Sequence, residues 1–313
     1  MSDVKRIATR ESYGNALVEL GQEYENLVVL DADLAGATKT GVFKKAFPER
    51  HINCGIAEGN MVGVAAGLAA AGFVPFASSF AMFAAGRAFE QVRNSVGYPH
   101  LNVKIAATHA GISVGEDGAT HQCNEDIALM RVIPGMVVIN PADDVEAKAA
   151  VKAAFHYDGP CYIRLGRLAV PVFNDEETYK FELGKGITLR EGKDVTIIAT
   201  GLMVSRALDA ASQLAAEGID ARVINIHTLK PIDKEIIVKA AKETGFIVTA
   251  EEHNVIGGLY SAVTEVTSQE APCKVVPVAV MDTFGKSGPA KELLDVFGLN
   301  AASIVEKVKA NLK

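Results

Sequence analysis

The sequence predicts an α/β protein with two domains, each built around a mostly parallel sheet. The chain has 313 residues, a length that suggests about two domains. Short apolar runs typical of strands alternate with helical patterns along both halves, as in sheets covered by helices on both faces. The alternation is lost over residues 171–193, which include the charged run Asn174-Asp175-Glu176-Glu177. We therefore expect a first domain over 1–170, a linker over 171–193 and a second domain over 194–313.

In the first half, the expected elements alternate in order. Residues 11–22 have the pattern of an amphipathic helix, and residues 26–31 form a short apolar strand. That strand leads into Asp31-Ala32-Asp33-Leu34, which places polar groups at the carboxyl end of a strand, where open α/β sheets bind ligands. Further strands are expected at 73–77, 103–107, 136–140 and 161–165, with helices from Glu58 to Gly72, from Ser78 to about Val96, over 124–130 and over 143–155.

The helix that begins at Glu58 is unusual in composition. After this one acid come thirteen residues without a charge, mostly Ala, Gly and Val, and Gly72 ends the run. We expect a buried helix, with one face of glycines (Gly59, Gly63 and Gly67) that another backbone can approach closely. Glu58 is either a helix-start acid favoured by the helix dipole or a carboxylate in an apolar wall with a proton-handling role.

A long glycine-rich loop over 108–122 carries two histidines, His109 and His121, and two acids, Glu116 and Asp117. Long loops inside compact domains are often functional. This set of side chains can shuttle protons, hydrogen-bond a polyol or bind a metal. The twelve-residue separation of the histidines fits no standard zinc spacing, so metal binding is the weaker interpretation.

In the second half, strands are expected at 194–199, 220–226, 246–250 and 275–280, with helices at 203–217, 233–243, 257–269 and 289–297. This pattern predicts a smaller α/β domain. Glu251-Glu252-His253 lies at a strand end, and we interpret it as a polar strand terminus at a dimer contact.

Composition excludes some classes of function. Hydrophobic residues make up 49% and charged residues 22%, as in soluble globular proteins. The net charge is −7 and the basic residues are scattered, which argues against a nucleic-acid partner. Apolar stretches are too short to span a membrane, and the N-terminus lacks a signal-peptide core. The four cysteines form no CxxC pair, so we expect reduced thiols in a cytoplasmic protein.

Several motifs together resemble the transketolase family. The octapeptide Gly115-Glu116-Asp117-Gly118-Ala119-Thr120-His121-Gln122, which follows Thr108-His109, is similar to the family's cofactor and substrate loop. The resemblance extends along essentially the whole chain and includes Ala8-Thr9-Arg10, Ala32-Asp33-Leu34, the run Ile163-Arg164-Leu165-Gly166-Arg167 and the run from Asp282 to Pro289. It implies a pyrimidine-binding domain followed by the transketolase C-terminal domain, with thiamine diphosphate as cofactor.

The Gly-Asp-Gly motif and later Asn that hold Mg²⁺ and the diphosphate in such enzymes are not found in the sequence. The chain therefore resembles the C-terminal half of a transketolase. The resemblance implies a separate N-terminal subunit that supplies the Mg²⁺ ligands, and an assembly of two large and two small subunits (α2β2). The implied reaction transfers a two-carbon ketol unit from a ketose phosphate to an aldose phosphate in the pentose phosphate pathway.

The resemblance also implies roles for single residues. Glu58 lies beside N1′ of the aminopyrimidine and favours the tautomer whose 4′-nitrogen takes up the thiazolium C2 proton. Phe83 stacks on the pyrimidine, with Phe80 beside it and Asp33 near the cofactor. The substrate-binding residues fall into two groups: His121 and Asp117 hold the hydroxyls and the reactive oxygen, and Arg10, His109 and Arg167 grip the sugar phosphate.

Two positions depart from the family pattern: Ala37 replaces a serine of the phosphate cluster, and Gly86 replaces a tyrosine of the aromatic cluster. Alternative hypotheses are a subunit related to deoxyxylulose-phosphate synthase, a 2-oxo acid dehydrogenase β subunit, and a non-catalytic scaffold subunit. The presence of Glu58, His121 and Asp117 argues against the scaffold. A nicotinamide-binding protein is rejected, because the glycines after Glu58 do not form the Gly-x-Gly-x-x-Gly turn.

Overall fold

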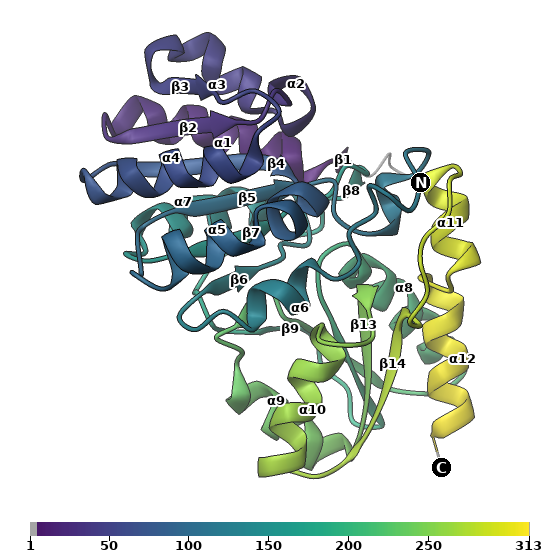
Figure 1. Ribbon diagram of the computed structural model, residues 1–313. Helices are drawn as coiled ribbons and strands as arrows, with labels where there is room; N and C mark the ends of the chain where they lie inside the picture. Colours follow the sequence, from purple (N-terminus) through teal and green to yellow (C-terminus); the bar gives the residue numbers. More distant parts are fainter. Residues whose placement is uncertain (1–4, 313) are drawn as a thin grey trace.

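The computed structural model describes residues 5–312, which form two α/β domains packed against each other (Figure 1). Residues 1–4 and 313, the outermost parts of the two expected domains, lie outside the described residues. One domain contains a seven-stranded sheet and the other a five-stranded sheet. The predicted α/β class with parallel-type sheets is confirmed. No helix among residues 5–312 is both long and apolar enough to cross a membrane.

The seven-stranded sheet has the order β12-β6-β7-β5-β4-β2-β3. All its neighbouring strands are parallel except β12, which pairs antiparallel with β6. The strands are β2 (Leu27–Asp31), β3 (His51–Asn53), β4 (Val74–Phe80), β5 (Lys104–Thr108), β6 (Val137–Ile139), β7 (Cys161–Arg164) and β12 (Thr228–Lys230). The two short strands at the edges, β3 and β12, were not predicted, because three residues make too short an apolar pattern.

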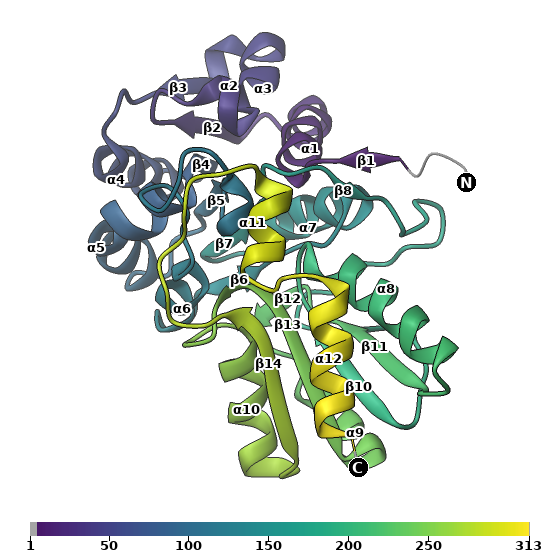
Figure 2. The ribbon, with the colours of Figure 1, turned by 90° about the vertical axis from the view of Figure 1, so that its right-hand side faces the viewer.

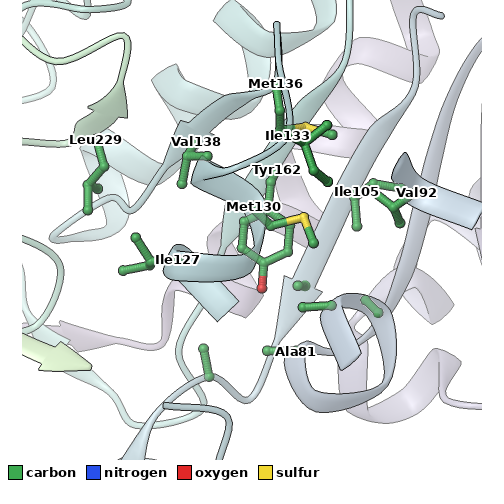
Figure 3. Close-up of a cluster of buried hydrophobic side chains, with 14 of the residues drawn as sticks. Ala81, Val92, Ile105, Ile127, Met130, Ile133, Met136, Val138, Tyr162 and Leu229 are labelled. Atoms are coloured by element: carbon green, nitrogen blue, oxygen red, sulfur yellow. The ribbon is translucent and has the colours of Figure 1, made fainter. Parts of the chain in front are cut away.

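Helices cover both faces of this sheet. One face packs against α1 (Thr9–Glu23) and α7 (Asp144–His156) through Val29, Phe76 and Ile139. The opposite face packs against α4 (Glu58–Ala70), α6 (Asp126–Arg131) and the helical segments η2 (Met82–Arg87), α5 (Phe89–Gln91) and η3 (Val92–Gly97). Figure 3 shows this second core around Tyr162, with Met130, Ile105 and Ile127 close by. Shorter helical segments are α2 (Ala35–Thr38), α3 (Thr40–Ala46), η1 (Pro48–Arg50) and η4 (Ile112–Val114).

The sequence predicts a buried helix here, but α4 is buried on one face only. It packs on the sheet through Met61, Val62 and Ala65, but Gly63 and Gly67 are exposed and a methyl group on either would meet no other atom within 4 Å. The glycine face therefore points away from the sheet of this chain. The glycine end of the helix is as predicted, because Gly72 has a φ of 93°, which favours glycine.

The second sheet has the order β14-β13-β10-β11-β9. Its strands are β9 (Ile187–Arg190), β10 (Val195–Ala199), β11 (Ala221–Asn225), β13 (Phe246–Asn254) and β14 (Lys274–Val280). One face is covered by α8 (Met203–Ala216) and α12 (Ala301–Asn311), and the other by α9 (Lys234–Thr244) and α10 (Leu259–Glu270). Figure 2 shows α12 and α11 (Ala290–Val296) following β14 at the end of the chain.

The stretch expected as a linker is partly structured. Strand β9 lies inside residues 171–193 and pairs antiparallel with β11 at the edge of the second sheet. At the other end of the stretch, β8 (Val170–Pro171) pairs antiparallel with β1 (Arg6–Ile7). Both pairings lie at half-exposed edges. The sequences of these strands therefore lack the continuous apolar run that marks a buried strand.

One of the hydrophobic clusters spans both domains. The face of the second sheet under α9 and α10 belongs to the same buried cluster as the α4 and α6 side of the first sheet. Strand β12 adds a covalent link, because it follows β11 in the second domain and then joins the first sheet. The ammonium of Lys230, the last residue of β12, donates to the carbonyl oxygens of Arg131 and Ile133. The relative position of the domains is therefore fixed by packing as well as by the chain.

Candidate active site

Glu58 is the first residue of α4, and its side chain is only 1% exposed. A buried carboxylate needs a charged or hydrogen-bonding partner. Its partner here is Arg87, whose Nη1 lies 2.9 Å from Glu58 Oε2. Both earlier interpretations of Glu58 are compatible with this position, because the residue starts a helix and also lies in an apolar wall.

The Glu58 carboxylate forms part of a pocket of about 240 Å³. The pocket is lined by Ala32, Asp33, Leu34, Ile56, Glu58, Phe83 and Arg87. Its walls are apolar apart from the carboxylates of Glu58 and Asp33 and the Arg87 guanidinium. One aromatic face and one buried carboxylate suit a flat, nitrogen-containing ring that stacks on one side and hydrogen-bonds at its edge.

Asp33 lies on the pocket wall in a left-handed conformation, with a φ of 63°. Asn53, at the end of β3, holds it there. The Asn53 side chain accepts a hydrogen bond from the Asp33 backbone N–H and donates one to Asp33 Oδ1, both at 3.1 Å. Asp31, the last residue of β2, accepts from the Leu34 backbone N–H, and its other oxygen lies 2.8 Å from His51 Nε2. These contacts fix the loop after β2.

The aromatic residues and histidines form one continuous cluster. Phe83 stacks on Phe80 with ring centroids 5.9 Å apart, and Phe80 stacks on His109 at 3.9 Å. The His121 ring meets Phe83 edge-on at 5.4 Å. The two predicted histidines of the 108–122 loop therefore lie against the two predicted phenylalanines, next to the Glu58 pocket.

Cationic groups gather at the other side of His109. Arg10 Nη1 lies 3.1 Å from His109 Nε2 and also donates to the carbonyl of Ala37 at 2.9 Å. Burial, together with the nearby charges of Arg10 and Arg167, lowers the pKa of His109 from 6.5 to about 3. The imidazole is therefore neutral near pH 7, and its nitrogen accepts from Arg10. This concentration of positive charge suits an anionic group.

Arg167 is held at the rim of this cluster. Its guanidinium donates to the carbonyl of Val114 and forms an ion pair with Glu116 at 3.0 Å. Asp117 is exposed, and within residues 5–312 no hydrogen bond or ion pair of its side chain is found. The other predicted site residues thus lie close together, from Glu58 and Asp33 at the pocket to Arg10 and Arg167 near His109, whereas Asp117 lies in the outer part of the loop.

Residues of the second domain form hydrogen bonds with the 108–122 loop and hold it in place. Glu252 accepts from the backbone N–H of Ser113, and its own carbonyl accepts from Arg164 at 2.9 Å. Gln122 donates to the carbonyl of Lys286 at 2.9 Å. Burial raises the pKa of Glu252 to about 7. These contacts make the second domain a scaffold for the loop.

Glu251-Glu252-His253 lies at the end of β13, as predicted, but its side chains are not exposed at a surface where a dimer contact could form. All three side chains are buried inside the chain: Glu252 and His253 face the first domain, and Glu251 faces α10 of the second. Glu251 accepts from the backbone N–H groups of Leu259 and Tyr260 at the start of α10. Charged residues at a strand end indicate a polar contact, but a sequence pattern does not identify which surface makes it.

The sequence reasoning missed Arg87 and Asn53. Arg87 had one detectable signal, since it is the first charged residue after Glu58 along the chain. Asn53 had none, because a single Asn at a strand end is common. For metal binding, no group of three or more His, Cys, Asp or Glu side chains suited to an ion is found among residues 5–312.

Two family models together match most of the chain. Residues 5–172 match the family model described as "Transketolase, pyrimidine binding domain", and residues 184–304 match "Transketolase, C-terminal domain". A protein of Methanocaldococcus jannaschii that is named as a transketolase C-terminal section is 52% identical, over 97% of this chain and 96% of that protein. The 6-deoxy-6-sulfo-D-fructose transketolase subunit SqwH of Clostridium sp. is 47% identical, over 95% of this chain and 92% of its own length.

A solved structure described as a split gene transketolase, inactive beta4 tetramer, is similar over the whole fold. It superposes with a TM-score of 0.92, is 58% identical and covers 98% of both chains. Both domains and their relative positions are therefore shared with that protein.

Proposed function

The chain belongs to the transketolase family as a split subunit, and from this premise we propose that it supplies the pyrimidine side of a thiamine diphosphate-dependent ketol transfer. The reaction we propose moves a two-carbon ketol unit from a ketose phosphate to an aldose phosphate, in the pentose phosphate pathway. The observation that carries the proposal is the buried Glu58 carboxylate beside the Phe83 ring in an apolar pocket.

The pocket fits the aminopyrimidine half of the cofactor. Glu58 would hydrogen-bond the ring nitrogen and hold a proton there, Phe83 would stack on the ring, and Asp33 would lie at its edge. When bound, thiamine diphosphate supplies the electron sink that the two-carbon transfer requires. The work of this chain is to orient the pyrimidine, exclude water from Glu58 and hold the substrate.

The cationic cluster is where we place the substrate's anionic end. Arg10 and Arg167 would bind a phosphate through charge-assisted hydrogen bonds, with neutral His109 between them. His121, a residue of the 108–122 loop whose ring meets Phe83 edge-on, would hydrogen-bond the sugar hydroxyls and the reactive oxygen. A sulfonate presents similar oxygens, and one relative is named for a sulfo-sugar. The assay below therefore includes both kinds of substrate.

The diphosphate and Mg²⁺ sites would come from a separate N-terminal subunit, in an α2β2 assembly. The missing Gly-Asp-Gly and Asn motif supports this arrangement. The similar solved structure, described as inactive, contains copies of one kind of chain. We place the assembly in the cytoplasm, where the free cysteines would stay reduced.

The test is ketol transfer from xylulose 5-phosphate to ribose 5-phosphate, with thiamine diphosphate and Mg²⁺. The chain is assayed alone and together with the product of the neighbouring open reading frame. We expect activity only in the mixture, lost with Glu58→Ala and kept with the exposed control Glu49→Ala. Activity of the chain alone would refute the split-subunit proposal. Activity in the mixture with 6-deoxy-6-sulfofructose but not with xylulose 5-phosphate would refute the proposed substrate.

A further inference from the structure

Arg87 makes two contacts in the Glu58 pocket. Its Nη1 donates to Glu58 Oε2 at 2.9 Å, and its guanidinium carbon lies 4.7 Å from the centre of the Phe83 ring, over the ring. The guanidinium therefore pairs with the buried carboxylate and covers the aromatic ring at the same time. It is a planar group with N–H donors at its edge.

An aminopyrimidine bound in this pocket needs the same two surfaces. Its protonated ring nitrogen is a donor that would pair with the Glu58 carboxylate, and its ring would stack on Phe83. The guanidinium presents its donor edge to the Glu58 carboxylate and its flat face to the Phe83 ring. Arg87 thus occupies, within the chain, the contacts that the proposed function assigns to the cofactor's pyrimidine.

The position of Arg87 also allows it to leave. Its side chain is 54% exposed, whereas that of Glu58 is 1% exposed. Among residues 5–312, Glu58 is the one hydrogen-bonding partner found for the Arg87 side chain. Arg87 is the last residue of the π-helical segment η2, and such segments are frequent at functional sites. The guanidinium regains water when it leaves, and the buried Glu58 carboxylate then needs a replacement donor, which the bound pyrimidine would supply.

We propose that Arg87 is a placeholder for the cofactor: it pairs with Glu58 and covers the Phe83 ring in the free chain, and it swings into solvent when thiamine diphosphate binds. This inference rests on the proposed function of the pocket. It explains how a buried carboxylate is kept paired in a subunit that folds before it meets its cofactor.

The test measures binding of 4-amino-5-hydroxymethyl-2-methylpyrimidine, the pyrimidine half of thiamine, to the full chain by calorimetry. This probe has no diphosphate, so it requires no partner subunit. Arg87→Met removes the charge and keeps the length of the side chain. We expect it to bind the probe about three- to tenfold more tightly than the wild type, because nothing must be displaced. The matched control is Arg93→Met, an exposed arginine on η3 that contacts Asn94 and not Glu58, and its affinity should equal that of the wild type.

Equal or weaker binding by Arg87→Met, with an unchanged circular dichroism spectrum, would overturn the inference. Glu58→Gln separates this failure from that of the proposed function. Loss of probe binding in Glu58→Gln, without a gain in Arg87→Met, would refute only the placeholder role. Wild-type affinity in Glu58→Gln would show that the probe does not use this pocket, and would refute the pyrimidine site itself.

Discussion

The carboxylate of Glu252 accepts a hydrogen bond from the backbone N–H of Ser113, across the boundary between the two domains. Ser113 lies in the loop that also carries His109 and His121. The second domain, which supplies none of the predicted site residues, therefore holds the conformation of the loop that does.

Replacement of Glu252 should loosen that loop. In Glu252→Ala the Ser113 N–H loses its buried acceptor, and we expect amide exchange over residues 111–115 to accelerate roughly tenfold. Glu252→Gln keeps an acceptor oxygen and should exchange nearly as slowly as the wild type. Hydrogen exchange followed by mass spectrometry measures both. Equal exchange in Glu252→Ala and the exposed control Glu265→Ala would contradict the prediction.

Arg10 should determine affinity for the charged end of the substrate. Removing a charge-assisted hydrogen bond to phosphate costs about 1.5–3 kcal/mol, so Arg10→Ala should raise KM for the sugar phosphate by roughly 10- to 100-fold and change kcat little. Steady-state kinetics of the assembled enzyme provide the measurement. The matched control is Arg6→Ala, whose guanidinium contacts the Ala169 carbonyl on the outside of the fold. If Arg10→Ala also raised KM equally for an unphosphorylated donor, Arg10 would not contact the phosphate.

His109 should stay neutral over the whole working range of pH. Its pKa of about 3, against an ordinary value of 6.5, results from burial and from the charges of Arg10 and Arg167. An NMR titration of the His109 ring should show no transition between pH 5 and 8. In Arg10→Ala the pKa should rise, because one of the two neighbouring cations is removed. A wild-type transition near pH 6.5 would rule out the proposed neutral acceptor.

Glu146 should make the chain less stable as the pH rises. Burial raises the pKa of Glu146 from its ordinary 4.5 to about 7, although Tyr179 and Asn225 donate to its carboxylate. Between these two values the folded chain binds the proton and the unfolded chain does not, so the free energy of unfolding falls with rising pH. The shift corresponds to about 3 kcal/mol.

Urea unfolding at a series of pH values tests this effect. Glu146→Gln cannot titrate, so relative to the wild type it should gain stability as the pH rises from 4.5 to 7. The exposed control Glu19→Gln, which loses only a surface pair with Lys152, should keep the wild-type pH dependence. Parallel curves for wild type and Glu146→Gln would show that Glu146 is ionised in the folded chain.

The main sheet strands were predictable because each buries a continuous apolar run. Strand β2 was expected at 26–31 and is found at Leu27–Asp31, and β10 was expected at 194–199 and is found at Val195–Ala199. Helix α12 was missed because only Ile304 and Val308 on it are buried, which leaves a stripe too narrow to stand out. A local sequence pattern therefore predicts a helix or strand more readily when that element buries more apolar surface.

Residues of the candidate site could be predicted where they belong to family motifs, but not where their role depends on a single contact in the folded chain. The resemblance singled out Glu58, Phe83 and His109 before any geometry was known. It did not reveal that Arg87 pairs with Glu58 or that Asn53 orients Asp33, because each pairing joins residues more than nineteen positions apart on different elements. Only the folded chain shows which polar groups meet.

Strand β12 links the two domains through the topology of the chain. It leaves the second domain to complete the first sheet beside β6, whose three residues are all buried. A fragment that ended in the charged stretch near residue 180 would contain every motif of the first domain, yet it would expose the β6 edge to the same strand of another copy. The domain boundary suggested by the sequence is therefore not a position at which the folded protein could be divided.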